Sequence, residues 1–210
     1  MQFTFKIGEK IKEAWPMYKL HFGSFILFIV ASGIAQIIGS RKNFILSSLS
    51  SILSLIIFYV LTRFILSLVD KKDYNPLSIN SLPTLGQFWN LLKTALLTSL
   101  SILGGFILLI IPGFYIAGRL MFSMYLSVEK NQGARVTIKE AWKMTEGYGW
   151  LLFWKSFVIA LFSGIGFLAF IVGGFVTYPI GMVVLVMMYR EFAKMKSETP
   201  VNPVIVETIK

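Results

Sequence analysis

This chain contains six long apolar stretches, and most of its charged side chains lie in the gaps between them. A bilayer span needs roughly 20 predominantly apolar residues, so each stretch is a candidate transmembrane helix. All 10 carboxylates fall in the gaps or in the terminal segments. The pattern predicts an all-α, polytopic membrane protein with six transmembrane helices. The predicted spans cover residues 22–38, 44–69, 91–111, 114–128, 150–172 and 175–189.

Lysine and arginine mark alternate gaps, and this asymmetry predicts the orientation. Loops that stay in the cytoplasm carry an excess of these residues. They gather before the first span and after the second, fourth and sixth, whereas the loops of the opposite side hold Arg41 and Lys42 alone. Both termini are therefore expected in the cytoplasm. We expect one membrane domain over residues 1–196 and a mobile cytoplasmic tail over residues 197–210.

Composition agrees with a membrane protein, since 56% of the residues are hydrophobic and 14% are charged. The net charge of +10 could indicate a nucleic-acid partner, but no basic run interleaved with aromatic residues stands outside the membrane pattern. Basic loops are attracted to anionic lipid headgroups, so membrane lipids, anionic ones above all, are the expected partners and nucleic acid is not. The chain has no cysteine and one histidine, His21, so neither a metal site nor a cofactor is expected.

A five-residue motif, Ile-Lys-Glu-Ala-Trp, occurs at residues 11–15 and again at 138–142. A degenerate copy at residues 88–93 also opens a span. The repeat predicts three units, each an amphipathic lead-in helix followed by a transmembrane hairpin. Shared interfacial composition is the alternative origin of so short a match.

The two clearest lead-in helices are predicted over residues 6–19 and 136–145, lying along the cytoplasmic surface of the membrane. A tryptophan flanked by lysine suits the headgroup boundary, where an amphipathic ring and a long ammonium side chain are both stable. The expected interfacial anchors are Trp15, Trp89 and Trp142.

Small and hydroxyl side chains recur at helical spacing on the second and third spans. Such stripes let helices approach closely and exchange weak hydrogen bonds, so helix packing is the expected role. A polar transport path is the alternative, although the stripes hold no carboxylate or imidazole for a proton relay. The stripes consist of Ser47, Ser51 and Ser54 on the second span and of Thr94, Thr98, Ser101 and Gly105 on the third.

Two arginines interrupt apolar runs, and an arginine inside a bilayer needs a partner or a route to the headgroups. Arg63 lies six residues before the end of its span, so its side chain can reach the cytoplasmic headgroups. Arg119 lies near the middle of the fourth span, after a helix break predicted at Pro112 and Gly113. Its possible partners are freed backbone carbonyls, water in a cavity or an anionic ligand.

These positions define the predicted ligand-binding residues. Tyr115 lies one helical turn before Arg119, so its hydroxyl could donate to the same anionic group. A pocket for an anion such as a lipid phosphate is therefore expected at Arg119 and Tyr115, with Arg63 as a further headgroup contact.

Part of the chain is similar to a known family. The similarity covers roughly residues 85–165 and rests on residues 105–115 (Gly-Phe-Ile-Leu-Leu-Ile-Ile-Pro-Gly-Phe-Tyr), Arg119, Tyr125, Glu129 and residues 141–147 (Ala-Trp-Lys-Met-Thr-Glu-Gly). These elements resemble the membrane domain attached to some glycerophosphodiester phosphodiesterases and its stand-alone relatives, the YciC-like bacterial membrane proteins. The resemblance implies a bacterial six-helix membrane domain. It does not imply phosphodiesterase activity, which in the fused proteins belongs to a separate soluble domain. Ala141 stands where the family usually has serine, so no functional hydroxyl is expected there.

Catalysis is not expected from these residues. General acid and base chemistry needs His, Asp or Glu side chains placed together. The candidate loop acids have mostly basic neighbours and are interpreted as solvated ion-pair partners. They are Asp70, Asp73, Glu129 and Glu146. No catalytic residue is therefore predicted.

Two function classes remain. The first is a non-catalytic protein of the bacterial cytoplasmic membrane that binds anionic lipid or a partner protein and organises the envelope. The second is a small transporter or channel for an anionic or amphipathic solute, for which the break at Pro112 and Gly113 near Arg119 is the supporting feature. We favour the first class, and assembly with a second copy or another membrane protein is left open.

Overall fold

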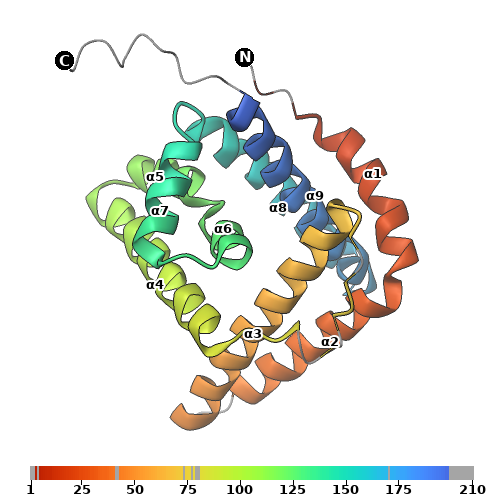
Figure 1. Cartoon of the computed structure of the whole chain (residues 1–210). Helices are drawn as coiled ribbons and strands as arrows, with labels where there is room; N and C mark the ends of the chain where they lie inside the picture. Colours follow the sequence, from red (N-terminus) through yellow and green to blue (C-terminus); the bar gives the residue numbers. More distant parts are fainter. Residues whose placement is uncertain are drawn as a thin grey trace, which may run out of the picture.

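The computed structural model describes residues 3, 5–40, 43–72, 74–76, 78, 81–169 and 171–198. Helices make up the regular structure of this part of the chain, and it contains no β-strand (Figure 1). The prediction of an all-α fold is confirmed. The helices are α1 (Ile7–Leu20), α2 (Phe22–Gly39), α3 (Phe44–Val69), α4 (Leu85–Leu108), α5 (Ile110–Leu120), α6 (Ser123–Lys130), α7 (Ala134–Met144), α8 (Gly149–Ala169) and α9 (Ile171–Glu198).

Four helices in the described residues are long and apolar enough to cross a membrane: α2, α3, α4 and Gly173–Ser197 of α9. They indicate a membrane location. The apolar segment Gly149–Gly164 of α8 is shorter. The predicted span over residues 114–128 is wrong as a single helix, because Met121 and Phe122 form a turn between α5 and α6. Of the tail predicted over residues 197–210, Ser197 and Glu198 instead continue α9, and residues 199–210 lie outside the described residues.

The predicted break at Pro112 and Gly113 occurs at Leu109, which has an extended backbone with φ −165° and ψ 152°. In an uninterrupted helix the ring of Pro112 would clash with the carbonyl of Leu108 and leave it without a hydrogen bond. Because the helix breaks at Leu109, Pro112 lies in the first turn of α5, where the backbone N–H groups have no partner within the helix. The missing N–H of proline therefore removes no helical hydrogen bond there. Gly113 therefore lies inside α5 rather than in a turn.

Despite its break, the α5–α6 segment runs back along α4. Gly105 packs against Gly113, since a Cβ on Gly105 would come 3.0 Å from the Cα of Gly113. Farther along, the hydroxyls of Thr98 and Ser123 share a hydrogen bond of 2.9 Å. The partners move toward the start of α4 as the chain advances through α5 and α6, so the two arms are antiparallel.

The two faces of α4 differ as a membrane helix requires. The inner face holds Thr94, Thr98 and Gly105, which are buried, so the packing role predicted for this stripe is confirmed. The outer face carries a stripe of leucine and isoleucine that is more than half exposed. A contiguous apolar surface of this kind is rare on soluble monomers. It consists of Leu96, Leu100, Leu103 and Ile107.

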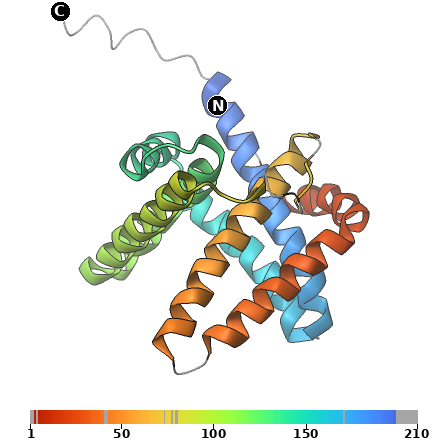
Figure 2. The same ribbon diagram turned by 60° about the horizontal axis from the view of Figure 1, so that its bottom comes forward.

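A second close pair joins α2 and α3 (Figure 2). The side chain of Asn43 caps the start of α3 by accepting a hydrogen bond of 3.0 Å from the backbone N–H of Ile45. The Ser50 hydroxyl donates to the Ala35 carbonyl over 2.6 Å and meets Gly39 closely. Ser50 is thus the packing contact, whereas Ser51 of the predicted stripe is exposed.

Helix α9 packs against α8, α3 and α1 (Figure 1). It also supplies much of the apolar core. Its fully buried residues include Val183, Val184, Met188 and Phe192. Helix α1 packs along α9, and the ammonium group of Lys10 in α1 lies 2.5 Å from the carboxylate of Glu191 in α9. Helices from opposite ends of the sequence therefore share one apolar core.

The two full copies of the repeat adopt the same environment. Ala14 in α1 and Ala141 in α7 are both fully buried, while Trp15 and Trp142 are 42% and 40% exposed. Equivalent burial of equivalent residues supports a common structural unit. The degenerate copy containing Trp89 lies inside α4, so the third unit has no separate lead-in helix. Placement of α1, α7 and the three tryptophans at a membrane surface stays a prediction.

Candidate functional site

Arg119 lies at the end of α5, and its side chain is 5% exposed. One terminal nitrogen donates a hydrogen bond of 2.6 Å to the carbonyl of Trp142, and the other donates to the hydroxyl of Tyr115 over 3.2 Å. The guanidinium also lies 4.4 Å from the centre of the Trp142 ring. Cation–π contacts of this kind are strongest when desolvated, as here.

Close backbone approach creates this arrangement. A Cβ on Gly118 would lie 2.1 Å from the carbonyl oxygen of Gly149, so α5 and α8 touch at a point where no side chain fits. On the other side, the Thr145 hydroxyl donates to the carbonyl of Arg119 over 2.7 Å. The end of α7 and the start of α8 therefore both contact the last turn of α5.

These contacts give Arg119 a structural role. Trp142 is in the last turn of α7, where carbonyls have no helical partner, so Arg119 caps that helix. Carbonyl capping was one alternative left open by the sequence, but the carbonyl belongs to α7 rather than to the break before Pro112. The hydroxyl of Tyr115 accepts a hydrogen bond from Arg119. Anion binding at Arg119 and Tyr115 stays a prediction.

Arg63 lies on α3 with an exposed side chain. It donates a hydrogen bond of 3.0 Å to the hydroxyl of Tyr59, one turn earlier. Its guanidinium carbon lies 5.8 Å from the ring centre of Tyr59 and 6.0 Å from that of Tyr74. Two aromatic rings therefore orient the cation.

A polar cluster, which sequence reasoning did not find, joins the ends of α3, α6 and α9. Arg190 of α9 donates to Asp70 over 2.6 Å and to Glu129, and Tyr189 donates to the other oxygen of Glu129. Of the four loop acids predicted to be solvated ion-pair partners, Asp70 and Glu129 do form ion pairs, but they share one arginine and their side chains are only partly exposed. Asp73 lies outside the described residues. Each residue of the cluster stands at the polar end of an apolar run, and that shared position was the available signal.

Two cavities adjoin this polar cluster, and both are lined by Glu129 and Arg190. One has a volume of about 550 Å³ and is lined on its other sides by α7 residues and by Lys196. The other has a volume of about 320 Å³ and extends to Arg63 and Tyr74. Glu129 and Arg190 therefore line both cavities.

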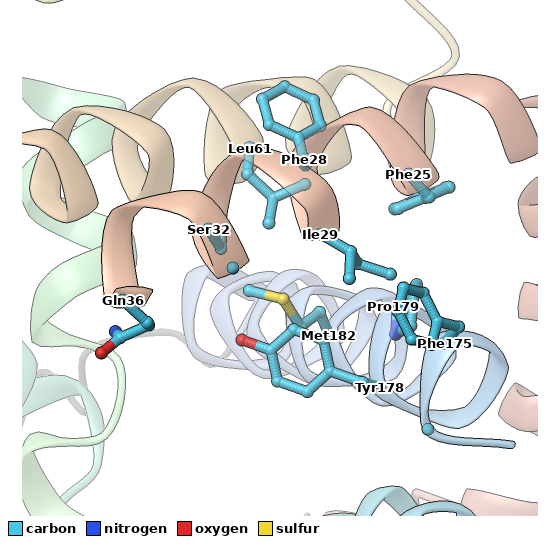
Figure 3. Close-up of a pocket in the computed structure, with 12 residues that line it drawn as sticks. Phe25, Phe28, Ile29, Ser32, Gln36, Leu61, Phe175, Tyr178, Pro179 and Met182 are labelled. Atoms are coloured by element: carbon cyan, nitrogen blue, oxygen red, sulfur yellow. The ribbon is translucent and has the colours of Figure 1, made fainter. Parts of the chain in front are cut away.

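A third cavity of about 410 Å³ lies between α2, α3 and α9 (Figure 3). Phe28 and Ile29 of α2 and Met182 of α9 give it an apolar wall. Ser32, Gln36 and Tyr178 add a few polar groups. An apolar cavity between three candidate membrane spans is suited to a hydrocarbon chain.

In the residues that the structure describes, no three His, Cys, Asp or Glu side chains are grouped so as to hold a metal ion. No family model matches the chain, and no curated protein or solved structure is significantly similar to it. The resemblance to the membrane domain of glycerophosphodiester phosphodiesterases therefore rests on the quoted motifs.

Proposed function

We propose that this chain is a non-catalytic integral protein of the bacterial cytoplasmic membrane that binds phospholipid, with a preference for anionic headgroups. Its four long apolar helices support a membrane location. The observation that carries the lipid-binding part is the apolar cavity between α2, α3 and α9.

The proposed topology has six crossings in three hairpins, with both termini in the cytoplasm. Helices α2, α3, α4 and α9 make four crossings, and α8 and the broken α5–α6 segment make the other two. Irregular backbone at membrane depth is tolerated where protein buries it. The break between α5 and α6 meets that requirement, because Leu120, Phe122 and Ser123 are at most 2% exposed.

The cavity is matched to an acyl chain by its lining and by its place among lipid-facing helices. The cavity has an apolar surface formed in part by Phe25, Ile29 and Leu61. A hydrocarbon chain bound there would displace water or bulk lipid from this surface. The outer surfaces of α2 are apolar too, with Ile34 and Ile37 52% and 67% exposed. A lipid chain could therefore pass from the bilayer into the cavity without crossing a polar surface.

Two glycines of α2 provide a matched test. Gly33 lines the cavity and Gly23 does not, and a Cβ on either glycine would meet no atom within 4 Å. Both variants replace a glycine of α2 by leucine, and only the side chain at position 33 would fill the cavity. We expect Gly33→Leu to reduce the number of phospholipids retained by the purified protein in native mass spectrometry, and Gly23→Leu to retain the wild-type number.

Equal lipid retention by the two variants, both folded by circular dichroism, would show that the cavity does not hold lipid. A preference for anionic lipid is read from the same spectra, by comparing retained phosphatidylglycerol with phosphatidylcholine when the protein is extracted from a mixture of both. Equal retention of the two lipids would contradict the proposed headgroup preference.

A further inference from the structure

The 320 Å³ cavity at the end of α3, which we call the Arg63 cavity, is lined by an excess of positive charge. Three cations, Arg63, Lys72 and Arg190, and two carboxylates, Asp70 and Glu129, line it in the described part of the chain. Among the described residues, three positive charges against two negative ones leave a surplus of one, which favours an anion.

The two carboxylates are already bound by protein cations. Arg190 contacts Asp70 at 2.6 Å and also contacts Glu129, while Lys72 lies 3.9 Å from Asp70. Arg63 forms no ion pair with any acid that the structure describes. Among the described side chains of the lining, Arg63 is the cation that no carboxylate contacts.

Two hydrogen-bond donors of the cavity lining are buried without a partner. They are the hydroxyl of Tyr74 and the Nε–H of Arg190. A buried donor that makes no hydrogen bond forfeits about 1–3 kcal/mol of solvation. A ligand with several acceptor oxygens would recover this energy. The excess of donors and cations in the lining therefore favours such a ligand.

The guanidinium of Arg63 is restrained by two neighbouring tyrosines. It donates a hydrogen bond to Tyr59 and lies near the rings of Tyr59 and Tyr74. A planar guanidinium can bind two oxygens of one phosphate in parallel, which an ammonium group cannot do. The geometry thus favours a tetrahedral oxyanion with at least two free oxygens.

We propose that the Arg63 cavity binds a phosphate group through Arg63, the Tyr74 hydroxyl and Lys72. The phosphate belongs either to a lipid headgroup or to a soluble phosphate ester. This site extends the proposed function by naming a group that the protein binds. It rests on the proposed function only if the phosphate belongs to a lipid. It is separate from the acyl-chain cavity between α2, α3 and α9, so the two are tested by different variants.

The experiment uses the full-length protein in two kinds of nanodisc. In the first, the lipid is phosphatidylcholine, and binding of added glycerol 1-phosphate is measured by titration calorimetry. In the second, half of the lipid is phosphatidylglycerol, and retention of that lipid is counted by native mass spectrometry. Binding in the first arm identifies a soluble ester as the ligand, and binding in the second arm alone identifies a headgroup.

Three variants locate the site. Arg63→Gln is expected to weaken binding about ten- to a hundredfold, since it removes a charged hydrogen-bonding partner. Tyr74→Phe is expected to weaken binding about two- to tenfold while leaving the unliganded protein as stable as wild type or more stable, because it removes an unpaired buried hydroxyl. Lys71→Gln removes the same charge from an exposed neighbour that does not line the cavity, and should bind as wild type does.

Equal binding by Arg63→Gln and Lys71→Gln would overturn the site, and so would failure of the wild-type protein to bind either probe. If Tyr74→Phe lowers the stability of the unliganded protein, the hydroxyl has a structural partner and its proposed role is wrong. A loss of lipid in Gly33→Leu together with unchanged binding in Arg63→Gln would refute this site and leave the proposed function intact.

Discussion

The hydroxyl of Tyr18 donates a hydrogen bond of 3.3 Å to the backbone carbonyl of Phe175, joining α1 to α9. Pro179 lies four residues after Phe175 within α9 and has no N–H, so this carbonyl lacks its helical donor. Tyr18 is 3% exposed and replaces that donor from a different helix. Attachment of α1 thus satisfies a group that α9 cannot satisfy by itself.

A double-mutant cycle tests this relationship. Tyr18→Phe should lower the free energy of unfolding by about 1–3 kcal/mol, because a buried carbonyl loses its donor. In a Pro179→Ala background the backbone N–H of residue 179 can bond to Phe175, so the same Tyr18→Phe change should cost close to nothing. Denaturant unfolding in detergent micelles measures all four proteins. Equal costs in the two backgrounds would mean that Tyr18 acts independently of the proline.

A second prediction concerns the contact between α5 and α8. Gly118→Ala should destabilise the protein by about 1–3 kcal/mol, because its Cβ would collide with the backbone carbonyl of Gly149, which cannot rotate away. Gly104 in α4 has open space around a Cβ, so Gly104→Ala should stabilise the protein by about 0.5–1 kcal/mol through helix propensity. Thermal unfolding midpoints should move in opposite directions, and a stable Gly118→Ala protein would refute the close approach.

Arg119 is expected to act as a cap for α7. Arg119→Gln should lower the free energy of unfolding by about 1.5–3 kcal/mol, since the Trp142 carbonyl and ring lose a charged partner. Arg135 is an exposed arginine at the start of the same helix, and Arg135→Gln should change stability by less than about 0.5 kcal/mol. Unchanged stability of Arg119→Gln, combined with loss of retained anionic lipid, would instead favour the anion pocket predicted from the sequence.

Glu140 in α7 is expected to make the stability of the protein depend on pH. Partial burial acts to raise the pKa of this carboxyl, but hydrogen bonds from Lys130 and Gln132 outweigh burial and hold its pKa below the ordinary value of 4.5. A carboxyl with a lower pKa in the folded state stabilises the protein above pH 4.5, and this contribution is lost as pH falls through the folded-state pKa.

We therefore expect Glu140→Gln to be less stable than wild type at pH 7 and to lose less stability than wild type on acidification. Unfolding midpoints of both proteins at pH 7 and at pH 3 provide the measurement. Parallel losses in the two proteins would show that Glu140 does not contribute to the acid sensitivity.

The topology has its own test. The distribution of lysine and arginine predicts that a reporter fused after Lys210 is active in the cytoplasm. Alkaline phosphatase fused there should be inactive and green fluorescent protein fluorescent, since the former folds after export and the latter in the cytoplasm. The reverse result would contradict the proposed orientation and the assignment of the basic loops.

Local properties of the sequence were sufficient for much of the fold. The predicted span over residues 44–69 coincides with α3, because apolar length and polar boundaries are read directly from the chain. A helix break near Pro112 was also predictable, since proline removes a donor wherever it stands. The buried stripe of Thr94 and Thr98 followed from helical spacing.

The tertiary structure alone decided which distant groups meet. Asp70 and Glu129 stand 120 and 61 residues from Arg190 in the sequence, and no local rule predicts that one guanidinium binds both. The carbonyl of Trp142 became the partner of Arg119 because α5 and α7 pack together, not because of the motif around either residue. Apolar patterning determines that a segment is a helix of a given length, whereas the side-chain partners depend on how complete helices pack, and that depends on the whole chain at once.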